Sequence, residues 1–329
     1  MNETTRAELS GSALFICPQG NNVLSADLEW CVPTLTKARR AKSLKPTGLK
    51  LLQSADLKRV PWLVHAFTTR PGGSTASYGG RTLNVGFTKD DLRASVERNR
   101  KQVLLATGAV TRGTQWPLVT LRQVHSDIIH VVRSRKPEKL LGDGLVTDLP
   151  RLALGILTAD CFPVLLVDTK KKAVGAFHAG WRGTVKRIVE KGVGTMRLEF
   201  GSRPEDILAA IGPGIQKCSF EVGQEVEDAF HTQFDYAAEL FHNVQESDAV
   251  RERYPMLFMN QRAPGHGDPC IKLHLDLREA NRRQLLAAGV PEANITVLTD
   301  CTFCQPRKFF SHRAERGKTG RQMALVGIQ

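Results

Sequence analysis

The stretch that decides the fold reads RLALGILTADCFPVLLVDTKKKAVGAFHAGWRGT and runs from Arg151 to Thr184. Three short apolar runs in this stretch predict β-strands, because runs of this length between turn residues are too short for helices. These runs are residues 151–157, 162–167 and 172–177. The last run ends at His178, and the residues that follow it open a predicted helix that continues to Arg197.

The same patterns extend outward on both sides of this stretch. They predict strands at residues 60–64 (an edge strand), 118–121, 128–132, 207–211, 295–298 and 323–328, and helices at 91–105, 220–230 and 276–288. Neither an internal repeat nor a linker separates these elements, so we expect one domain of mixed strands and helices. Residues 56–329 form this expected domain, and residues 1–55 are an N-terminal extension of unclear role.

Composition limits the possible partners. The 329 residues carry 46 Lys and Arg against 33 Asp and Glu, a net charge of +13 that favours anionic partners such as phosphate or is simply a solvated surface. We find no nucleic-acid-binding motif and no apolar run that could span a membrane. Seven cysteines, an odd number in a long chain without a secretory signal, favour the reducing cytoplasm. The oligomeric state stays open.

Three predicted strand ends or turns each present one potential metal ligand, namely His125, Cys161 and His178. Two imidazoles and one thiolate suit zinc, and three protein ligands leave a fourth position for water or substrate. Their spacing satisfies no short motif, so each residue could equally be structural.

Residues beside these candidates support a ligand site. Gly180 and Gly183 flank Arg182 at the start of the predicted helix, where a close backbone approach and free N–H groups suit an anion. Arg182 could bind phosphate or pack. Asp160 precedes the cysteine and could orient a ligand, accept a proton or cap a turn.

Several motifs together carry a resemblance to a known family. They are Gln123-Val124-His125, Ala159-Asp160-Cys161-Phe162-Pro163, His178-Ala179-Gly180-Trp181-Arg182-Gly183, residues 69–74, 83–86, 211–215 and 220–223, and the C-terminal segments 309–313 and 319–321. In this order they resemble the YfiH-like, laccase-domain family of purine nucleoside phosphorylases, from about residue 60 to the C-terminus. The chain departs from the family at Gly142-Asp143-Gly144, where alanines often flank the aspartate.

The resemblance implies an α+β fold, a four-layer α/β/β/α sandwich with mixed β-sheets. It also implies that His125, Cys161 and His178 bind zinc at the base of a pocket. The implied activities are phosphorolysis of adenosine, inosine and methylthioadenosine, and deamination of adenosine. A copper-dependent polyphenol oxidase activity has also been attributed to the family.

The implied chemistry needs residues that hold phosphate and move protons. Arg70 and Asn84 in the glycine-rich region and Arg182 are the candidates for phosphate, because a guanidinium can bind it through two parallel hydrogen bonds. Their alternative role is to brace the loops. Asp160 is the candidate for proton transfer or ligand orientation.

Other functions remain open. Cys161 with His125 or His178 could form a cysteine hydrolase, with the thiolate as nucleophile. A copper oxidase would need several histidine-rich sites, which nine histidines without a His-x-His pair disfavour. The chain could also be a non-catalytic partner. We expect Cys301 and Cys304 to be buried or free thiols, because a second C-x-x-C pair is missing, and Cys17, Cys31, Cys218 and Cys270 to be structural or free.

Overall fold

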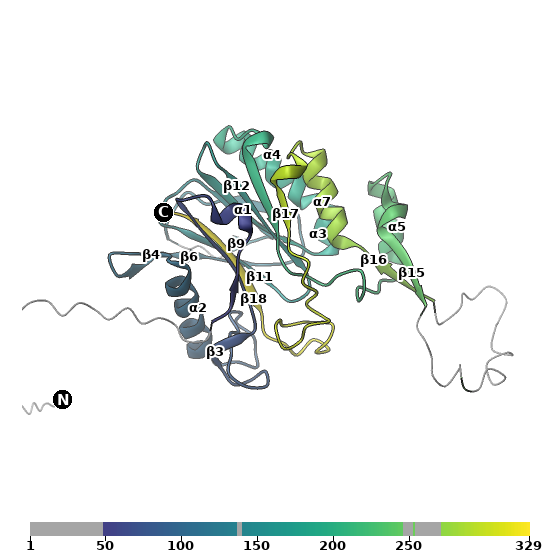
Figure 1. The fold of residues 1–329 in the computed structure, drawn as a ribbon, viewed down its shortest axis with the longest axis horizontal. Coiled ribbons are helices and arrows are strands. Elements are labelled where there is room, and N and C mark those ends of the chain that lie inside the picture. Colours follow the sequence, from purple (N-terminus) through teal and green to yellow (C-terminus); the bar gives the residue numbers. More distant parts are fainter. Residues whose placement is uncertain (1–48, 137–139, 246–252, 254–270) are drawn as a thin grey trace, which may run out of the picture. The chain divides into compact units, whose positions relative to one another are not determined.

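The computed structural model describes residues 49–136, 140–245, 253 and 271–329, whose fold is drawn in Figure 1. Most of the expected N-terminal extension lies outside the described residues, as do Cys17, Cys31 and Cys270. The end of that extension is part of the folded body. It forms β1 (Leu51–Leu52) and the start of α1 (Ala55–Lys58), whose Leu57 is fully buried.

The first of two large sheets has five strands in the order β1-β2-β18-β11-β6. Its neighbours pair antiparallel except β11 and β6, which are parallel. The further strands of this sheet are β2 (Leu63–Thr68), β18 (Gln322–Ile328), β11 (Ala153–Thr158) and β6 (Leu118–Val119). The edge strand predicted at residues 60–64 is wrong, because the strand begins only at Leu63 and the pairing of β1 places it inside the sheet.

The second sheet has six strands in the order β17-β14-β12-β13-β10-β8. Its bounds are β17 (Ile295–Val297), β14 (Ile207–Ile211), β12 (Phe162–Asp168), β13 (Ala173–Ala179), β10 (Gly144–Thr147) and β8 (Ile129–Val131). The central strands pair antiparallel, whereas β17 and β8 pair parallel to their neighbours at the two edges. Both large sheets are therefore mixed.

Strand β12 shows why its sequence is apolar without interruption. Val164 and Leu166 point into a core shared with the helices, whereas Leu165 and Val167 point into a core shared with β11 and β18. Successive side chains of a strand face opposite sides of the sheet, so a strand that is covered on both sides needs an apolar residue at nearly every position. The two large sheets pack face to face through the second of these cores.

Helices cover the outer faces of the sheets. Helix α2 (Arg93–Thr107) packs on the five-stranded sheet through Val103 and Leu104. On the six-stranded sheet lie α3 (Trp181–Val185), α4 (Ile188–Phe200) and α7 (Leu277–Ala287), and α5 (Gln224–Gln233) packs against α3. These helices are seen on the two sides of the strands in Figure 1. Asp276 caps α7, because its side chain accepts the N–H of Glu279.

The single helix predicted from residue 179 to Arg197 is two helices. Arg187 adopts a left-handed backbone (φ 62°) between α3 and α4, which interrupts the helical hydrogen bonds. The Arg187 guanidinium is held there by Glu190 and the carbonyl of Gln233. The helix predicted from residue 220 begins later, at Gln224, because residues 220–223 contact the chain near β16 instead.

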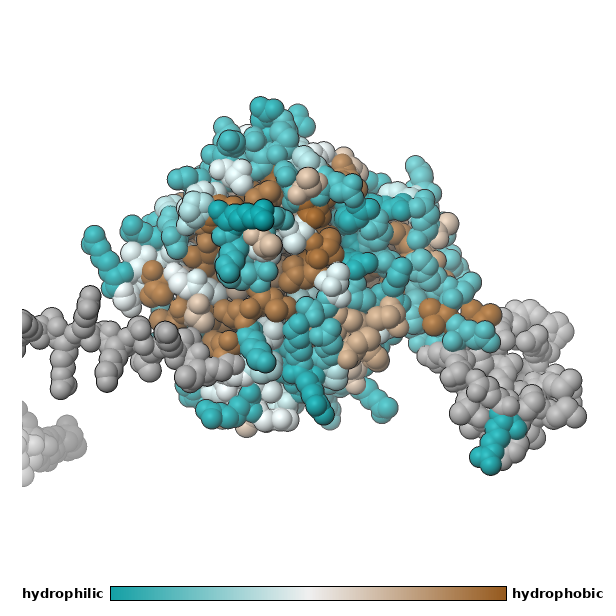
Figure 2. Space-filling view, viewed as in Figure 1, coloured by the Kyte–Doolittle hydropathy of each residue, from teal (hydrophilic) through white to brown (hydrophobic). Residues whose placement is uncertain are grey.

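Short elements complete the described body. They are β3 (Pro71–Thr75), β4 (Val110–Thr111), β5 (Thr114–Gln115), β7 (Leu121–Arg122), β9 (Leu140–Leu141), β15 (Phe241–Gln245), β16 (Ile271–Leu275) and the 3-10 helices η1 (Pro204–Asp206), η2 (Ala237–Leu240) and η4 (Glu292–Asn294). The mixed α+β class is confirmed. Figure 2 shows hydrophobic residues gathered in the middle of the viewed face, with hydrophilic residues around them. None of the helices described is long and apolar enough to cross a membrane.

Candidate metal centre and pocket

The three predicted ligands come from two loops and one strand of the chain. His125 lies in the loop between β7 and β8, Cys161 directly precedes β12, and His178 lies in β13. The register of the sheet pairs Pro163 with His178. Cys161 directly precedes β12, and His178 lies near the end of the antiparallel β13. The thiol and the imidazole therefore lie at the same end of these two neighbouring strands.

The ligand atoms of these residues converge. One nitrogen of each imidazole and the Cys161 sulfur all lie within 4.8 Å of one another, and the Cys161 Sγ lies 3.9 Å from His125 Nε2. The two imidazole rings meet edge to face, with centroids 4.9 Å apart. His178 is buried, whereas His125 is exposed, so the group has one side in the protein and one side open. The three side chains can therefore share a single ion.

Asp143 holds two of the three candidate ligands, His125 and His178, in place. Its fully buried carboxylate accepts the backbone N–H groups of Val124, His125 and Ser126 and the Ser126 hydroxyl, at 2.7–3.1 Å. The same carboxylate lies 2.8 Å from His178 Nδ1. This contact directs the other ring nitrogen, Nε2, to the metal position, as in the carboxylate–histidine–metal arrangement of many metal sites.

These contacts set the charges of the site. Burial alone would raise the pKa of Cys161, but the neighbouring His178 and the contact with His125 outweigh it and lower the thiol's pKa below its usual range. For His178 the directions are reversed. Burial alone would lower its pKa, but Cys161 and Asp143 outweigh burial and raise that pKa. Sulfur binds metals and attacks electrophiles as the thiolate, which this environment favours.

Backbone geometry at the site is unusual. Asp160 and His125 both have positive φ angles, 92° and 59°, although neither is glycine. Such conformations are costly and persist where neighbouring contacts impose them, often at functional sites. Gly180 leaves room for the ligands, since a Cβ atom there would lie 2.9 Å from the Cys161 sulfur and 3.0 Å from the His125 ring.

The three ligands lie in the wall of a pocket of about 610 Å³. Eight of its other lining residues are apolar or aromatic: Phe87, Leu121, Leu157, Ala159, Trp181, Ile215, Phe220 and Leu277. Four are basic: Lys89, Arg182, Arg313 and Arg321. A concave site that combines apolar surface with polar and charged groups suits a small molecule, and the four cations suit an anionic group on that molecule.

Of the predicted phosphate-binding residues, only Arg182 lines this pocket. Its guanidinium lies 4.3 Å from the centroid of the Trp181 ring. Arg70 pairs with Glu315 and donates to the carbonyls of Tyr78 and Pro306, away from the pocket lining. Asn84 is fully buried, where it accepts the N–H groups of Gly86 and Arg321 and donates to Asp91.

Asp160 lines the pocket, but both of its carboxylate oxygens already accept hydrogen bonds from other residues of the chain. Oδ1 accepts the hydroxyl of Thr302, and Oδ2 accepts the backbone N–H of Arg313, each at 2.7 Å. Asp160 thus ties the loop of Cys161 to two segments near the C-terminus.

Two residues of the site were not singled out from the sequence. Asp143 was visible there only as an aspartate between two glycines. The glycine after it, Gly144, leaves no room for a side chain, because a Cβ atom there would lie 2.7 Å from Ile129 and 2.9 Å from Phe177. Arg321 lines the pocket, and burial lowers its pKa, while Tyr78, Cys161 and Asp160 act in the opposite direction. Its place in the motif 319–321 was its only signal.

The sequence of the described fold matches one family of proteins. The sequence model of the multi-copper polyphenol oxidoreductase laccase family matches residues 64–329. The chain belongs to this family. The resemblance to YfiH-like proteins drawn from the motifs is therefore confirmed.

The chain is also similar to individual proteins and to solved structures. A purine nucleoside phosphorylase of Deinococcus radiodurans is 38% identical over 282 residues, 85% of this chain and 94% of that protein. The adenosine deaminase RL5 of an unknown prokaryotic organism is 38% identical over 213 residues, 62% of this chain and 72% of its own. The crystal structure of the hypothetical protein YfiH of Bacillus licheniformis is 33% identical with a TM-score of 0.68, covering 81% of this chain and 93% of that one.

Proposed function

We propose that this chain is a zinc-dependent purine nucleoside phosphorylase that acts on adenosine, inosine and methylthioadenosine with phosphate, and that it also deaminates adenosine. The convergence of His125, Cys161 and His178 in the wall of a basic and apolar pocket carries this proposal. The names of the relatives support it, since they are purine nucleoside phosphorylases and an adenosine deaminase. The proposal includes the four-layer α/β/β/α arrangement and a cytoplasmic location, which the free thiols favour.

The donor set fits zinc. Two imidazoles and one thiolate form a three-ligand set with an open position, as in catalytic zinc sites. The contact of His178 with Asp143 supplies the outer support that such ligands usually have. A bound zinc ion supplies Lewis acidity to a substrate or water in the pocket.

Residues of the pocket would bind the purine, bind the phosphate and transfer a proton. The aromatic and aliphatic wall, with Trp181 and Phe220, offers surfaces on which a purine can stack. Arg182, Arg313 and Arg321 supply positive charge for phosphate and for negative charge that develops on the leaving purine. Asp160 holds the loop of Cys161, and we assign it proton transfer at its carboxylate once substrate displaces a local donor. Arg70 and Asn84 brace the neighbouring loops.

A cysteine hydrolase is the second candidate. The Cys161 sulfur lies 3.9 Å from His125 Nε2, and the lowered pKa of its thiol suits a nucleophile. The two candidates differ in whether Cys161 is a ligand or an attacking group.

The variant Cys161→Ala separates the two candidates. For a ligand, we expect zinc to fall by about one equivalent per chain and phosphorolysis of inosine and adenosine to fall by at least about 100-fold, because one of three protein ligands is lost. Elemental analysis and chromatography of the products from nucleoside plus phosphate measure both quantities. His130→Ala is the matched control, since this imidazole bonds the carbonyl of Leu141 outside the pocket lining. Full phosphorolysis in Cys161→Ala would refute the zinc mechanism, and lost turnover with unchanged zinc would indicate the nucleophile.

A further inference from the structure

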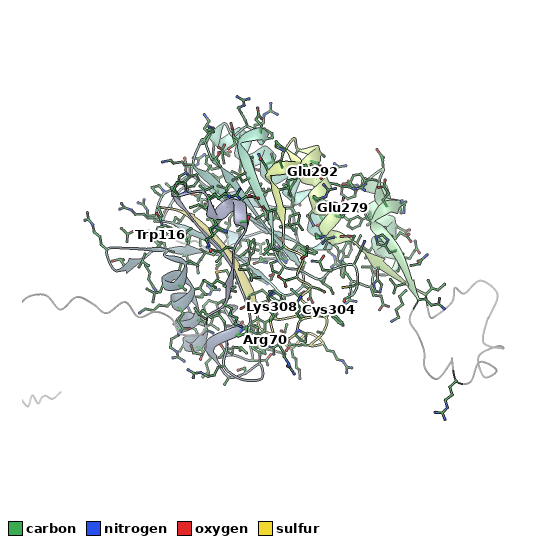
Figure 3. All side chains as sticks on the ribbon, in the orientation of Figure 1. Arg70, Trp116, Glu279, Glu292, Cys304 and Lys308 are labelled. Atoms are coloured by element: carbon green, nitrogen blue, oxygen red, sulfur yellow. The ribbon has the colours of Figure 1, made fainter. Side chains whose placement is uncertain are left out.

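A second group of sulfur atoms lies next to the pocket. Cys218 is in the segment between β14 and α5, and Cys301 and Cys304 are in the segment that follows β17, 83 and 86 positions later in the chain. The Cys218 sulfur lies 3.7 Å from that of Cys301 and 3.5 Å from that of Cys304, and all three lie within 4.8 Å of one another. Cys304 is labelled in Figure 3.

These distances fit a metal better than a disulfide. In a tetrahedral site with Zn–S bonds of about 2.3 Å, neighbouring sulfurs are about 3.8 Å apart. A disulfide needs sulfurs about 2.05 Å apart. We propose that Cys218, Cys301 and Cys304 bind a second thiophilic divalent cation, zinc in particular, separate from the ion of the pocket.

The surroundings of the sulfurs support this site. The hydroxyl of Ser219 lies 3.1 Å from the Cys304 sulfur and 3.3 Å from that of Cys218, so Ser219 or a water it positions can complete four ligands. The backbone N–H of Gln216 donates to the sulfur of Cys301 at 3.4 Å. Donated hydrogen bonds of this kind stabilise a thiolate, which is the form that binds metals.

The position of the cluster indicates a structural role. Cys301 is buried, whereas Cys218 and Cys304 are exposed, which gives an ion a path from solvent. Ile215 and Phe220, on both sides of the Cys218 segment, line the pocket. Thr302, beside Cys301, bonds the carboxylate of Asp160. An ion here joins two segments that shape the pocket wall, and four protein or water ligands would leave it without a site for substrate.

The C-x-x-C pair alone offered two ligands, which is why the sequence indicated free thiols. The third ligand comes from Cys218, which the pairing of Gly214 with Cys301 brings alongside. Among the described residues no disulfide involves these cysteines.

The test measures metal in a chain whose pocket ion has been removed. In Cys161→Ala, purified without chelator, we expect about one equivalent of zinc to remain. Adding Cys304→Ser or, separately, Cys218→Ser to this variant should remove it, because two thiolates hold zinc far more weakly than three. Ser219→Ala is the matched control, since it keeps all three sulfurs and a water can replace the hydroxyl. Circular dichroism checks that each variant is folded.

Cobalt and mass measurements give an independent reading on the same proteins. Cobalt added to the metal-free Cys161→Ala variant should produce the near-ultraviolet sulfur-to-cobalt band of several thiolates, and Cys304→Ser should reduce it. If Cys161→Ala retains no zinc and binds no cobalt through sulfur, the proposal is wrong. A mass about 2 Da lower, from oxidation of Cys218 with Cys301 or Cys304 to a disulfide, would overturn it as well. Neither result depends on whether the pocket ion or the nucleoside activity exists.

Discussion

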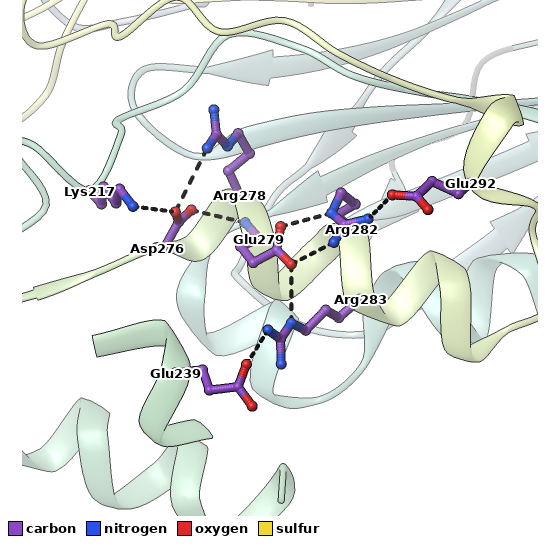
Figure 4. A network of polar contacts seen from close by, with 8 residues as sticks. All are labelled: Lys217, Glu239, Asp276, Arg278, Glu279, Arg282, Arg283 and Glu292. Carbon is purple, nitrogen blue, oxygen red and sulfur yellow. Dashed lines mark hydrogen bonds and ion pairs between the residues drawn. The ribbon is translucent and has the colours of Figure 1, made fainter. Parts of the chain in front are cut away.

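Two carboxylates organise polar networks in this molecule, Asp143 beneath the metal centre and Glu279 on α7. Asp143 is fully buried and holds a histidine, a hydroxyl and three backbone N–H groups. Glu279, with 24% of its side chain exposed, bonds Arg282 and Arg283 of its own helix. Figure 4 shows how Glu239 and Glu292 extend this second network at its ends.

The two networks have similar hydrogen-bond distances, but they differ in how much water reaches the carboxylate. Both carboxyl groups have a lowered pKa, that of Asp143 through His178 and Ser126 against the effect of burial, and that of Glu279 mainly through Arg282. Water replaces lost partners at the surface, whereas a buried group that loses its partner stays unsatisfied. The same hydrogen-bond length therefore carries a large effect at Asp143 and a small one at Glu279.

The variant Asp143→Ala should show the largest effect. It leaves the buried His178 and three N–H groups without their acceptor, so we expect a loss of about 3–5 kcal/mol in the free energy of unfolding. Zinc affinity should fall about 10–100-fold, because the His178 ring loses its orientation. Denaturant unfolding and competition with a zinc-binding dye measure these quantities.

Ser126→Ala is the control for this variant. It removes one hydroxyl donor to Asp143 but keeps the contact with His178. Its cost should be near about 1 kcal/mol, with zinc affinity retained. If Asp143→Ala costs no more than Ser126→Ala, the contrast between the buried and the surface carboxylate fails.

The sequence predicted the parts of this contrast that depend on local pattern. The strands at 162–167, 172–177 and 207–211 were predicted from short apolar runs, and the structure explains these runs, because a strand buried on both faces is apolar throughout. His125, Cys161 and His178 were grouped through motifs of a family, and the structure brings them together.

What the sequence did not predict depends on long-range contacts. Asp143 binds residues 17–35 positions away, and Cys218 meets Cys301 across 83 positions. No local periodicity encodes such pairs, which arise only when the sheet forms. The left-handed turn at Arg187 was also missed, because a long polar side chain fits a helical pattern well.

His65 extends the comparison to a buried base outside the site. This residue of β2 is 2% exposed, its Nε2 accepts the N–H of Ser54, and burial lowers its pKa from 6.5 to about 4. The unfolded chain therefore binds a proton in this range that the folded chain does not. The stabilising effect is complete above pH 6.5 and is lost as the pH falls towards 4, by up to about 3 kcal/mol.

Denaturant unfolding at several pH values tests this window. The free energy of unfolding of the wild type should fall more steeply below pH 6.5 than that of His65→Gln, whose side chain does not titrate. Comparing the two proteins cancels the titration of the carboxylates that they share. Parallel curves would show that His65 binds a proton to the same extent in the folded and the unfolded chain, and would contradict its burial as a neutral acceptor.

Small effects are expected for the surface network, beginning with Glu279→Gln. Its carboxylate bonds Arg282 through both oxygens, at 2.8 Å each, yet water reaches both groups. A partly exposed ion pair contributes at most about 1 kcal/mol, and salt screens it. We therefore expect a loss below about 1 kcal/mol in the free energy of unfolding, which shrinks further in concentrated sodium chloride. Glu292→Gln, whose own side chain is 79% exposed, should cost still less. A salt-independent loss as large as that of Asp143→Ala would mean that the network on α7 behaves as a buried one, and that exposure does not separate these two regions.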